Sequence, residues 1–313
     1  MIQKRPYEFM VSYTPQTQWI EKGGIKLWLA FFFIELGAGM FFVASVFDNL
    51  RAMSIGWLLC AVLGGGLHLL YLGKPLRFWR MAFSSGWKTS WISRGIIFVS
   101  LFLILGLIHM VLIPSATRFT ALLVAADIPS ATRFTALLVA ADIFAFLTVI
   151  YGGFAMNYVN GIPLWNTALL PILYVVSGLW GGAEVTLGIA LGSGAIGIGP
   201  AIEEWIRLLL IGFIFLIPVY LMSVRYTSSA GQVSVRHMVL SEWSPLFWIG
   251  VIILGMAVPL TAVISSLLTG LEGASVALLY AAILSGLIGD LAMRYLILKC
   301  GMYAPLIPSS CNP

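Results

Sequence analysis

Three side chains that can exchange protons stand inside long apolar runs of the chain. Glu35 lies in FFFIELGAGMFF, His68 in GGGLHLLYLG and Tyr151 in VIYGGF. A carboxylate, an imidazole and a phenol can donate or accept hydrogen bonds and can act in acid–base catalysis. An ionisable group inside a bilayer costs about 3 kcal/mol or more, so each is a functional candidate. Glu35 is the strongest on position, because its neighbours in the sequence are all apolar or glycine.

Two further carboxylates, Asp142 and Asp290, also lie within apolar runs. Together with Glu35 they could form a proton path through the depth of the protein. Asp142 has a simpler interpretation as well, since it could pair with a neighbouring helix. We place His109 and Glu184 near the outer interface and expect them to be solvated.

His68 and Tyr151 also have structural interpretations. His68 could hydrogen-bond a neighbouring helix and do nothing else, and Tyr151 could be an ordinary aromatic residue of the membrane interface. Both are placed near the same face of the membrane, the one on which the chain begins.

A basic and aromatic connection separates two apolar runs between Gly64 and Gly95. Its basic residues are Lys74, Arg77, Arg80, Lys88 and Arg94, in a chain with only 17 Lys and Arg. Positive charge concentrated between two membrane segments indicates a surface that docks a polar partner or holds anionic lipid. We predict that these five residues dock a partner.

The elements that must position these groups are transmembrane helices. The chain of 313 residues is 60% hydrophobic and 9% charged, with a mean hydropathy of +1.01. Soluble domains carry roughly 25% charged residues, so we predict an all-α, multi-pass membrane protein. The eight expected spans, grouped in two four-helix bundles, cover residues 25–47, 53–72, 91–113, 133–158, 163–190, 205–226, 244–268 and 274–298.

An even number of spans places both ends of the chain on one side. Thirteen basic residues fall on that side and four on the other, which together make the 17. By the positive-inside rule the termini are cytoplasmic, and the protein lies in the inner (cytoplasmic) membrane. We expect an N-terminal segment 1–24 without a signal peptide, a membrane domain 25–300 and a tail 301–313.

Composition excludes several kinds of site. Three cysteines, none in a CxxC pair, cannot ligate an iron–sulfur centre or a four-coordinate zinc, and three histidines at different depths offer no haem b site. The glycine run 192–199 lacks the Lys-Ser/Thr ending of a phosphate-binding loop. Nothing indicates nucleic acid. The fifteen-residue segment IPSATRFTALLVAAD occurs twice in tandem, at 113–127 and 128–142, and we expect the first copy at the outer surface.

Three stretches carry a resemblance to a known family. LHLLYLGKPLRFWRM followed by TSWISRG resembles the second-to-third helix region of the NrfD/PsrC family, the membrane subunit of polysulfide-reductase-like complexes. IYGGFAMNYVNGIPLWNTALLPILYVVSGL (150–179) is similar to its fourth and fifth helices, and LIGDLAMRYLILKCG is similar to its end. Eight spans without haem or iron–sulfur ligands fit the family as well, and together with these stretches they cover most of the chain.

The resemblance implies a quinone-reactive membrane subunit without haem or iron–sulfur centre of its own. Such a subunit binds a (mena)quinone near the face where a ferredoxin-like iron–sulfur subunit docks, and that subunit serves a molybdopterin catalytic subunit. The family's quinone-contacting tyrosine, fourteen residues before the tryptophan of PLWN, corresponds to Tyr151. A first-helix histidine known in one relative is absent here, and Glu35 or His68 could replace it.

Two other functions remain open at this point. A secondary transporter would use the buried carboxylates for proton coupling, and inverted repeats would favour it. A purely structural anchor would need neither Tyr151 nor His68. The terminal substrate of the complex is chosen by another subunit and cannot be inferred from this sequence.

Overall fold

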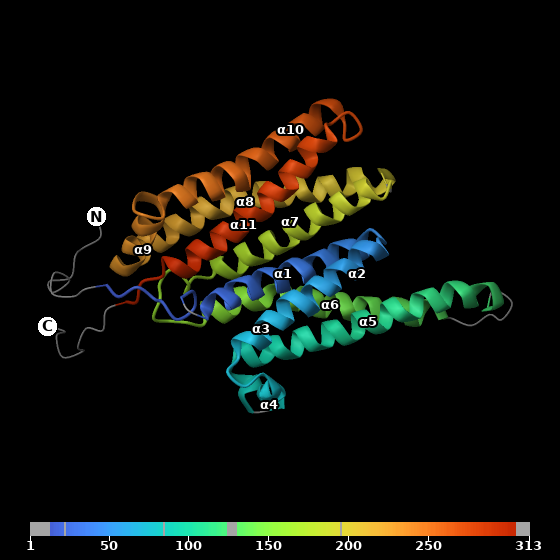
Figure 1. Cartoon of the computed structure of the whole chain (residues 1–313), viewed down its shortest axis with the longest axis horizontal. Helices are drawn as coiled ribbons and strands as arrows, with labels where there is room; N and C mark the ends of the chain where they lie inside the picture. Colours follow the sequence, from blue (N-terminus) through green and yellow to red (C-terminus); the bar gives the residue numbers. More distant parts are fainter. Residues whose placement is uncertain (1–12, 22, 84, 124–129, 195, 305–313) are drawn as a thin grey trace. The chain divides into compact units, whose positions relative to one another are not determined.

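The computed structural model describes residues 13–21, 23–83, 85–123, 130–194 and 196–304, and its helices confirm the predicted fold class (Figure 1). Eight of the described helical segments are long and apolar enough to span a membrane. These spans are Gly24–Val46, Leu50–Tyr71, Trp91–Val111, Ala136–Asn157, Leu169–Gly192, Gly199–Thr227, Leu246–Thr269 and Val276–Lys299. The described residues form no β-strand, only an isolated bridge between Pro15 and Met302.

Several of these spans consist of more than one helical element. The helices are α1 (Gly24–Val46), α2 (Leu50–Leu58), α3 (Gly66–Tyr71), α4 (Trp79–Phe83), α5 (Trp91–Leu123), α6 (Ser130–Asn157), α7 (Leu169–Gly192), α8 (Gly199–Thr227), α9 (Ser229–Leu240), α10 (Val258–Thr269) and α11 (Val276–Lys299). Two π-helical segments complete the second and seventh spans, η2 (Leu59–Gly65) and η6 (Leu246–Ala257).

The chain divides into two compact units, whose boundaries pass through α1, α6, α7 and α8. Unit 1 comprises residues 1–28, 153–173 and 210–313, and unit 2 comprises residues 29–152 and 174–209. The predicted grouping into two four-helix bundles, and the single domain 25–300, stay predictions.

Helix α1 is the central element of unit 2, and small residues bring other helices against its backbone. A Cβ on Gly37 would lie 2.5 Å from the carbonyl oxygen of Gly56 on α2, and one on Gly39 would lie 2.8 Å from the carbonyl carbon of Gly178 on α7. In lipid, burial of apolar surface does not drive helices together. Such close approach instead lets van der Waals and polar contacts hold the helices against one another.

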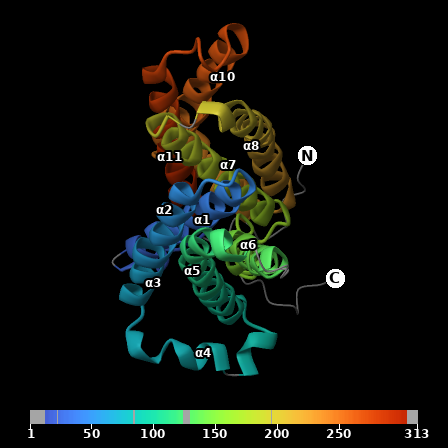
Figure 2. The same cartoon turned by 90° about the vertical axis from the view of Figure 1, so that its right-hand side faces the viewer.

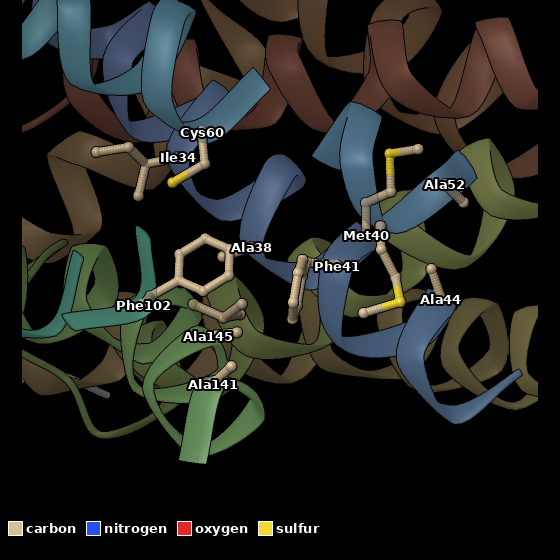
Figure 3. Packing of buried hydrophobic residues seen from close by; sticks show 12 residues of the cluster. Ile34, Ala38, Met40, Phe41, Ala44, Ala52, Cys60, Phe102, Ala141 and Ala145 are labelled. Carbon is tan, nitrogen blue, oxygen red and sulfur yellow. The ribbon is translucent and has the colours of Figure 1, made fainter. Parts of the chain in front are cut away.

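An apolar core surrounds this backbone packing (Figure 3). Side chains of α1 meet those of the second, third and fourth spans there, and the labelled members are Ile34, Ala38, Met40, Phe41, Ala44, Ala52, Cys60, Phe102, Ala141 and Ala145. The core therefore holds α1 in a fixed rotation, which decides where Glu35 points.

The second span changes its winding just before His68. Segment η2 is π-helical and is followed by the single short helix α3, on which His68 lies. Gly64 in η2 packs against α1, since a Cβ there would be 2.8 Å from the backbone nitrogen of Ile34. Wider π turns re-aim the residues that follow them and are frequent at functional sites.

Unit 1 brings the two ends of the chain together. The backbone nitrogen of Gln16 donates to the carbonyl oxygen of Gly301 at 2.9 Å, and that of Tyr303 donates to Thr14. The first and last described segments of the chain therefore lie side by side, and that both ends lie on one side of the membrane stays a prediction. Trp165 of the PLWN motif is fully buried beside them, and its indole nitrogen donates to the carbonyl oxygen of Ile297 at 2.7 Å.

The repeated segment is helical where it is described. Helix α5 continues through the first copy as far as Leu123, and α6 starts in the second copy at Ser130. Residues 124–129, where the copies join, lie outside the described residues.

Candidate functional site

Three aromatic rings from three spans meet in unit 2. The ring of Phe31 on α1 lies 5.3 Å from that of His68 on α3 and 5.9 Å from that of Tyr151 on α6, measured between centroids. The rings of His68 and Tyr151 are 6.4 Å apart. Two of the residues predicted from the sequence to bind a quinone are therefore neighbours, and Phe31 packs against both of them.

Glu35 lies one helical turn after Phe31 on the same face of α1 and is fully buried. Its carboxyl group packs against the backbone of Gly152, the residue after Tyr151, where a Cβ would collide with Oε1 and lie 3.1 Å from Cδ. On the α7 side, a Cβ on Gly178 would be 3.6 Å from the Cβ of Glu35. The structure thus places Glu35 between α6 and α7, directly beside Tyr151.

The ring of Tyr151 lies against the first turn of α5. A Cβ on Gly95 would collide with ring atoms Cδ2 and Cε2 and would be 2.6 Å from Cζ. Tyr151 itself is only 4% exposed. The ring is therefore held between the backbone of α5 on one side and Phe31 and His68 on the other.

The hydrogen bond of His68 determines which of its nitrogens is available. Nδ1 lies 3.1 Å from the carbonyl oxygen of Gly64, four residues earlier. A carbonyl can only accept, so Nδ1 carries the proton of this bond, and Nε2 of a neutral imidazole is left as an acceptor. Nε2 is buried and has no hydrogen-bond partner among the described residues. Because His68 is half-buried, it is the most accessible of the four side chains.

The cluster combines an imidazole acceptor, a phenol and a carboxyl group within apolar surroundings. These groups can hold the two oxygen atoms of a quinone ring and exchange protons with them. Within the described ranges, no three His, Cys, Asp or Glu side chains lie close enough together to hold a metal ion.

Asp142 lies farther from Glu35 than expected. Its Oδ1 accepts a hydrogen bond of 2.8 Å from the hydroxyl of Ser45, the penultimate residue of α1. Ten residues of helix, about 15 Å, separate Ser45 from Glu35. Asp142 is thus beside the last turn of α1, away from Glu35.

Asp290 is in unit 1 and is half of a buried ion pair. The Nε of Arg294, one turn later on α11, donates to both of its carboxylate oxygens at 3.0 Å. An arginine on both oxygens favours a fixed carboxylate over one that accepts and releases protons. Its part in a proton path stays a prediction.

The expectation that His109 and Glu184 are solvated is wrong. His109 on α5 is 4% exposed and Glu184 on α7 is 2% exposed. Position along a span gives depth but not the face of the helix, and α5 continues beyond Val111, so His109 is not near its end.

The connection between the second and third spans, residues 72–90, is called the basic loop below. It contains the short helices η3 (Pro75–Arg77), α4 and η4 (Ser85–Lys88), which pass the ends of α3 and α5 (Figure 2). Its exposed basic residues are Lys74, Arg77, Arg80 and Lys88, and its exposed large apolar residues are Leu76, Trp79, Phe83 and Trp87.

Arg94 differs from the other four predicted docking residues. Its Nε donates to the carbonyl oxygen of Trp87 at 3.1 Å, its guanidinium also donates to the carbonyl oxygen of Lys88, and it lies 4.8 Å from the ring centroid of Trp91. These contacts hold the end of the basic loop against α5, so Arg94 is engaged within the chain.

Phe31, Gly95 and Gly152 are parts of the site that the sequence reasoning missed. Phe31 could have been found from its spacing of four residues before Glu35. Gly152 directly follows Tyr151, and Gly95 ends the TSWISRG motif. Each of these glycines contacts a side chain of another span, and such contacts between spans cannot be inferred from spacing along one helix.

Comparison with known proteins agrees with this architecture. The model of the family described as polysulphide reductase NrfD matches residues 23–305. A protein of Haemophilus influenzae named "Protein NrfD homolog" is 24% identical over 273 residues, which cover 80% of this chain and 84% of that protein. NrfD proteins are in general quinone-interacting membrane subunits of oxidoreductase complexes. Since the matched region includes all eight spans, the chain belongs to the NrfD family.

Proposed function

We propose that this chain exchanges electrons between a (mena)quinone and a ferredoxin-like iron–sulfur subunit that serves a molybdopterin catalytic subunit. Membership of the NrfD family supports the class of reaction. The observation that carries the proposal is the cluster in unit 2, where the acceptor Nε2 of His68 lies beside the rings of Phe31 and Tyr151.

The bound quinone supplies the two-electron chemistry. Nε2 of His68 would accept a hydrogen bond from one hydroxyl of the reduced ring and take one of the two protons that leave with its two electrons. The hydroxyl of Tyr151 holds the ring by a second hydrogen bond, and Phe31 provides an apolar surface that excludes water. Glu35, fully buried beside Gly152, would take the second proton through the hydroxyl of Tyr151 and pass it onward.

The onward proton path is long, because the carboxylates are far apart. Glu35 and the Asp142–Ser45 pair both belong to unit 2 but lie about 15 Å apart along α1, so water must bridge them. Asp290 belongs to the path only if the proton passes its ion pair with Arg294. We therefore assign Glu35 the first role.

The partner subunit docks at the basic loop in this proposal. The four exposed cations attract an acidic surface, and the exposed Leu76, Trp79, Phe83 and Trp87 supply apolar contact area. The basic loop directly follows α3, on which His68 lies, so electrons would leave the site toward the docked partner. We place the chain in the inner membrane with cytoplasmic termini, as the charge distribution predicts.

The test uses the complex purified gently from its native membrane. A menaquinol analogue should bleach the visible iron–sulfur absorbance of the partner, and Tyr151→Phe should abolish the bleaching while the subunits stay assembled. Trp165→Phe serves as a control, because it loses a buried hydrogen bond in unit 1 but leaves the cluster intact. Bleaching that survives Tyr151→Phe and His68→Gln unchanged would leave only the role of a structural anchor.

A further inference from the structure

We infer that Gly95 and Gly152 are positioning residues of the quinone site, acting through Tyr151 and Glu35. The inference rests on the proposed function. Gly95 lies on α5 and packs against Tyr151 of α6, and Gly152 lies on α6 and packs against Glu35 of α1. Each glycine leaves room that any other residue would fill with its Cβ.

Gly95 sets the position of the Tyr151 ring. Three atoms of that ring lie where a Cβ on Gly95 would have to be, with Cζ at 2.6 Å. Carbon atoms pack at roughly 3.5 to 4.0 Å, so a methyl group at this position displaces the ring by about 1 Å. The other ring neighbours are Phe31 and His68, so the ring moves against them or α5 moves away.

This displacement changes the site where the ligand binds. The spacing of 6.4 Å between the rings of His68 and Tyr151 sets how two hydrogen-bonding groups reach one ligand. A misplacement of about 1 Å in an active site can cost on the order of 100-fold in rate. Gly95 therefore affects the reaction by positioning the ring of Tyr151, although it has no side chain of its own.

Gly152 has the corresponding role for Glu35. Oε1 of Glu35 occupies the place of a Cβ on Gly152, and Phe31 Cδ1 would be 3.2 Å from it. On the α7 side, the Cβ of Glu35 would be 3.6 Å from a Cβ on Gly178, which is an ordinary contact distance. A side chain at residue 152 thus expels the carboxyl group from beside Tyr151.

A shorter acid provides a specific suppressor. Glu35→Asp withdraws the carboxyl group by one C–C bond, about 1.5 Å, which relieves the collision with an alanine at residue 152. The thermal stability of Gly152→Ala should therefore be restored by adding Glu35→Asp. A merely structural loss of helix packing between α1 and α6 would not be repaired by removing a further methylene group.

Two other glycines provide matched controls. A Cβ on Gly66, in α3, has no atom within 4 Å, so Gly66→Ala should not lower stability and should leave turnover unchanged. A Cβ on Gly255, in unit 1, would be 2.9 Å from the Cα of Gly289. Gly255→Ala should lower stability while the complex that still assembles keeps its KM for quinol.

The experiment measures the rate of iron–sulfur bleaching against menaquinol-analogue concentration, together with thermal unfolding, in the assembled complex. Gly95→Ala should raise KM or lower kcat/KM by 10-fold or more, whereas Gly66→Ala should not. Unchanged kinetics in Gly95→Ala would overturn the inference, provided that Tyr151→Phe still abolishes bleaching. If Tyr151→Phe has no effect, the proposed function fails instead. If Gly95→Ala does not assemble, the inference is tested by the suppressor pair instead. A double variant Gly152→Ala with Glu35→Asp that is no more stable than Gly152→Ala alone would then refute the inference.

Discussion

Removing Arg294 should destabilise the protein far more than removing Arg294 and the charge of Asp290 together. The two side chains are 3% and 7% exposed, and both carboxylate oxygens accept from Nε at 3.0 Å. Breaking a buried ion pair by deleting one partner leaves an uncompensated charge and costs about 3–5 kcal/mol. Replacing both charges by neutral groups of similar size is often neutral. Arg294→Gln should therefore lose about 3–5 kcal/mol, and Asp290→Asn with Arg294→Gln about 1 kcal/mol or less.

The assay is equilibrium unfolding in mixed micelles, followed by helical circular dichroism, for the two single variants and the double variant. Each single variant leaves one buried charge unpaired and should lose about 3–5 kcal/mol, so the coupling energy from this cycle should be about 5 kcal/mol or more. Additive losses would show that the pair carries no mutual stabilisation. The same variants test the proton path, because Asp290→Asn should keep quinol turnover. Turnover lost in the assembled double variant, whose stability should be nearly unchanged, would refute the view that Arg294 holds Asp290 as a fixed carboxylate.

Three further predictions concern other parts of the chain. Glu35→Gln should abolish quinol turnover at unchanged assembly; normal turnover measured in the purified complex would remove Glu35 from the mechanism. Reversing the charges of the four exposed cations of the basic loop should release the iron–sulfur subunit at moderate salt, scored by co-purification, whereas Arg51→Glu, at an exposed arginine in the first turn of α2, should not. Burial, with a smaller contribution from the charge of Glu242, raises the pKa of Cys300 from 9.0 to about 12. Its folded-state pKa is the higher one, so this group stabilises the fold below pH 9 and loses that contribution as the pH rises toward 12; alkylation at pH 8 should need denaturant.

The eight spans could be predicted from the sequence because a long apolar segment has one stable form in lipid. Every backbone polar group must be satisfied within the segment, so an apolar run of about 20 residues becomes a helix. The ends were less accurate, since the second span starts at Leu50 rather than at residue 53, and α5 continues to Leu123. Helix ends depend on caps, as in the side chain of Asn49 accepting from Ala52, and such caps are local polar contacts that hydropathy does not detect.

The residue types of the candidate site could be predicted from the sequence, but their arrangement in space could not. Tyr151, His68 and Glu35 were identified because each is polar in an apolar run, and the structure brings them together. What brings them together is packing between helices, through Gly37 and Gly56, that no periodicity in one helix reveals. The ion pair of Asp290 was different, because its partner lies four residues later on the same helix. That spacing was readable from the sequence and was overlooked.

The glycines of unit 2 connect stability with function in this protein. Glycine is among the less favourable residues for a helix, yet at Gly95 and Gly152 it lies in helices directly against the two side chains that the reaction needs. A larger residue would strengthen each helix and separate the groups that must meet. The unfavourable helix propensity of glycine is offset where a side chain of another helix packs into the space that a Cβ would occupy. Tyr151 packs there at Gly95, and Glu35 packs there at Gly152. It follows that stabilising glycine-to-alanine changes should be tolerated at Gly66, where nothing lies near, and rejected where a functional side chain occupies the position of the missing Cβ.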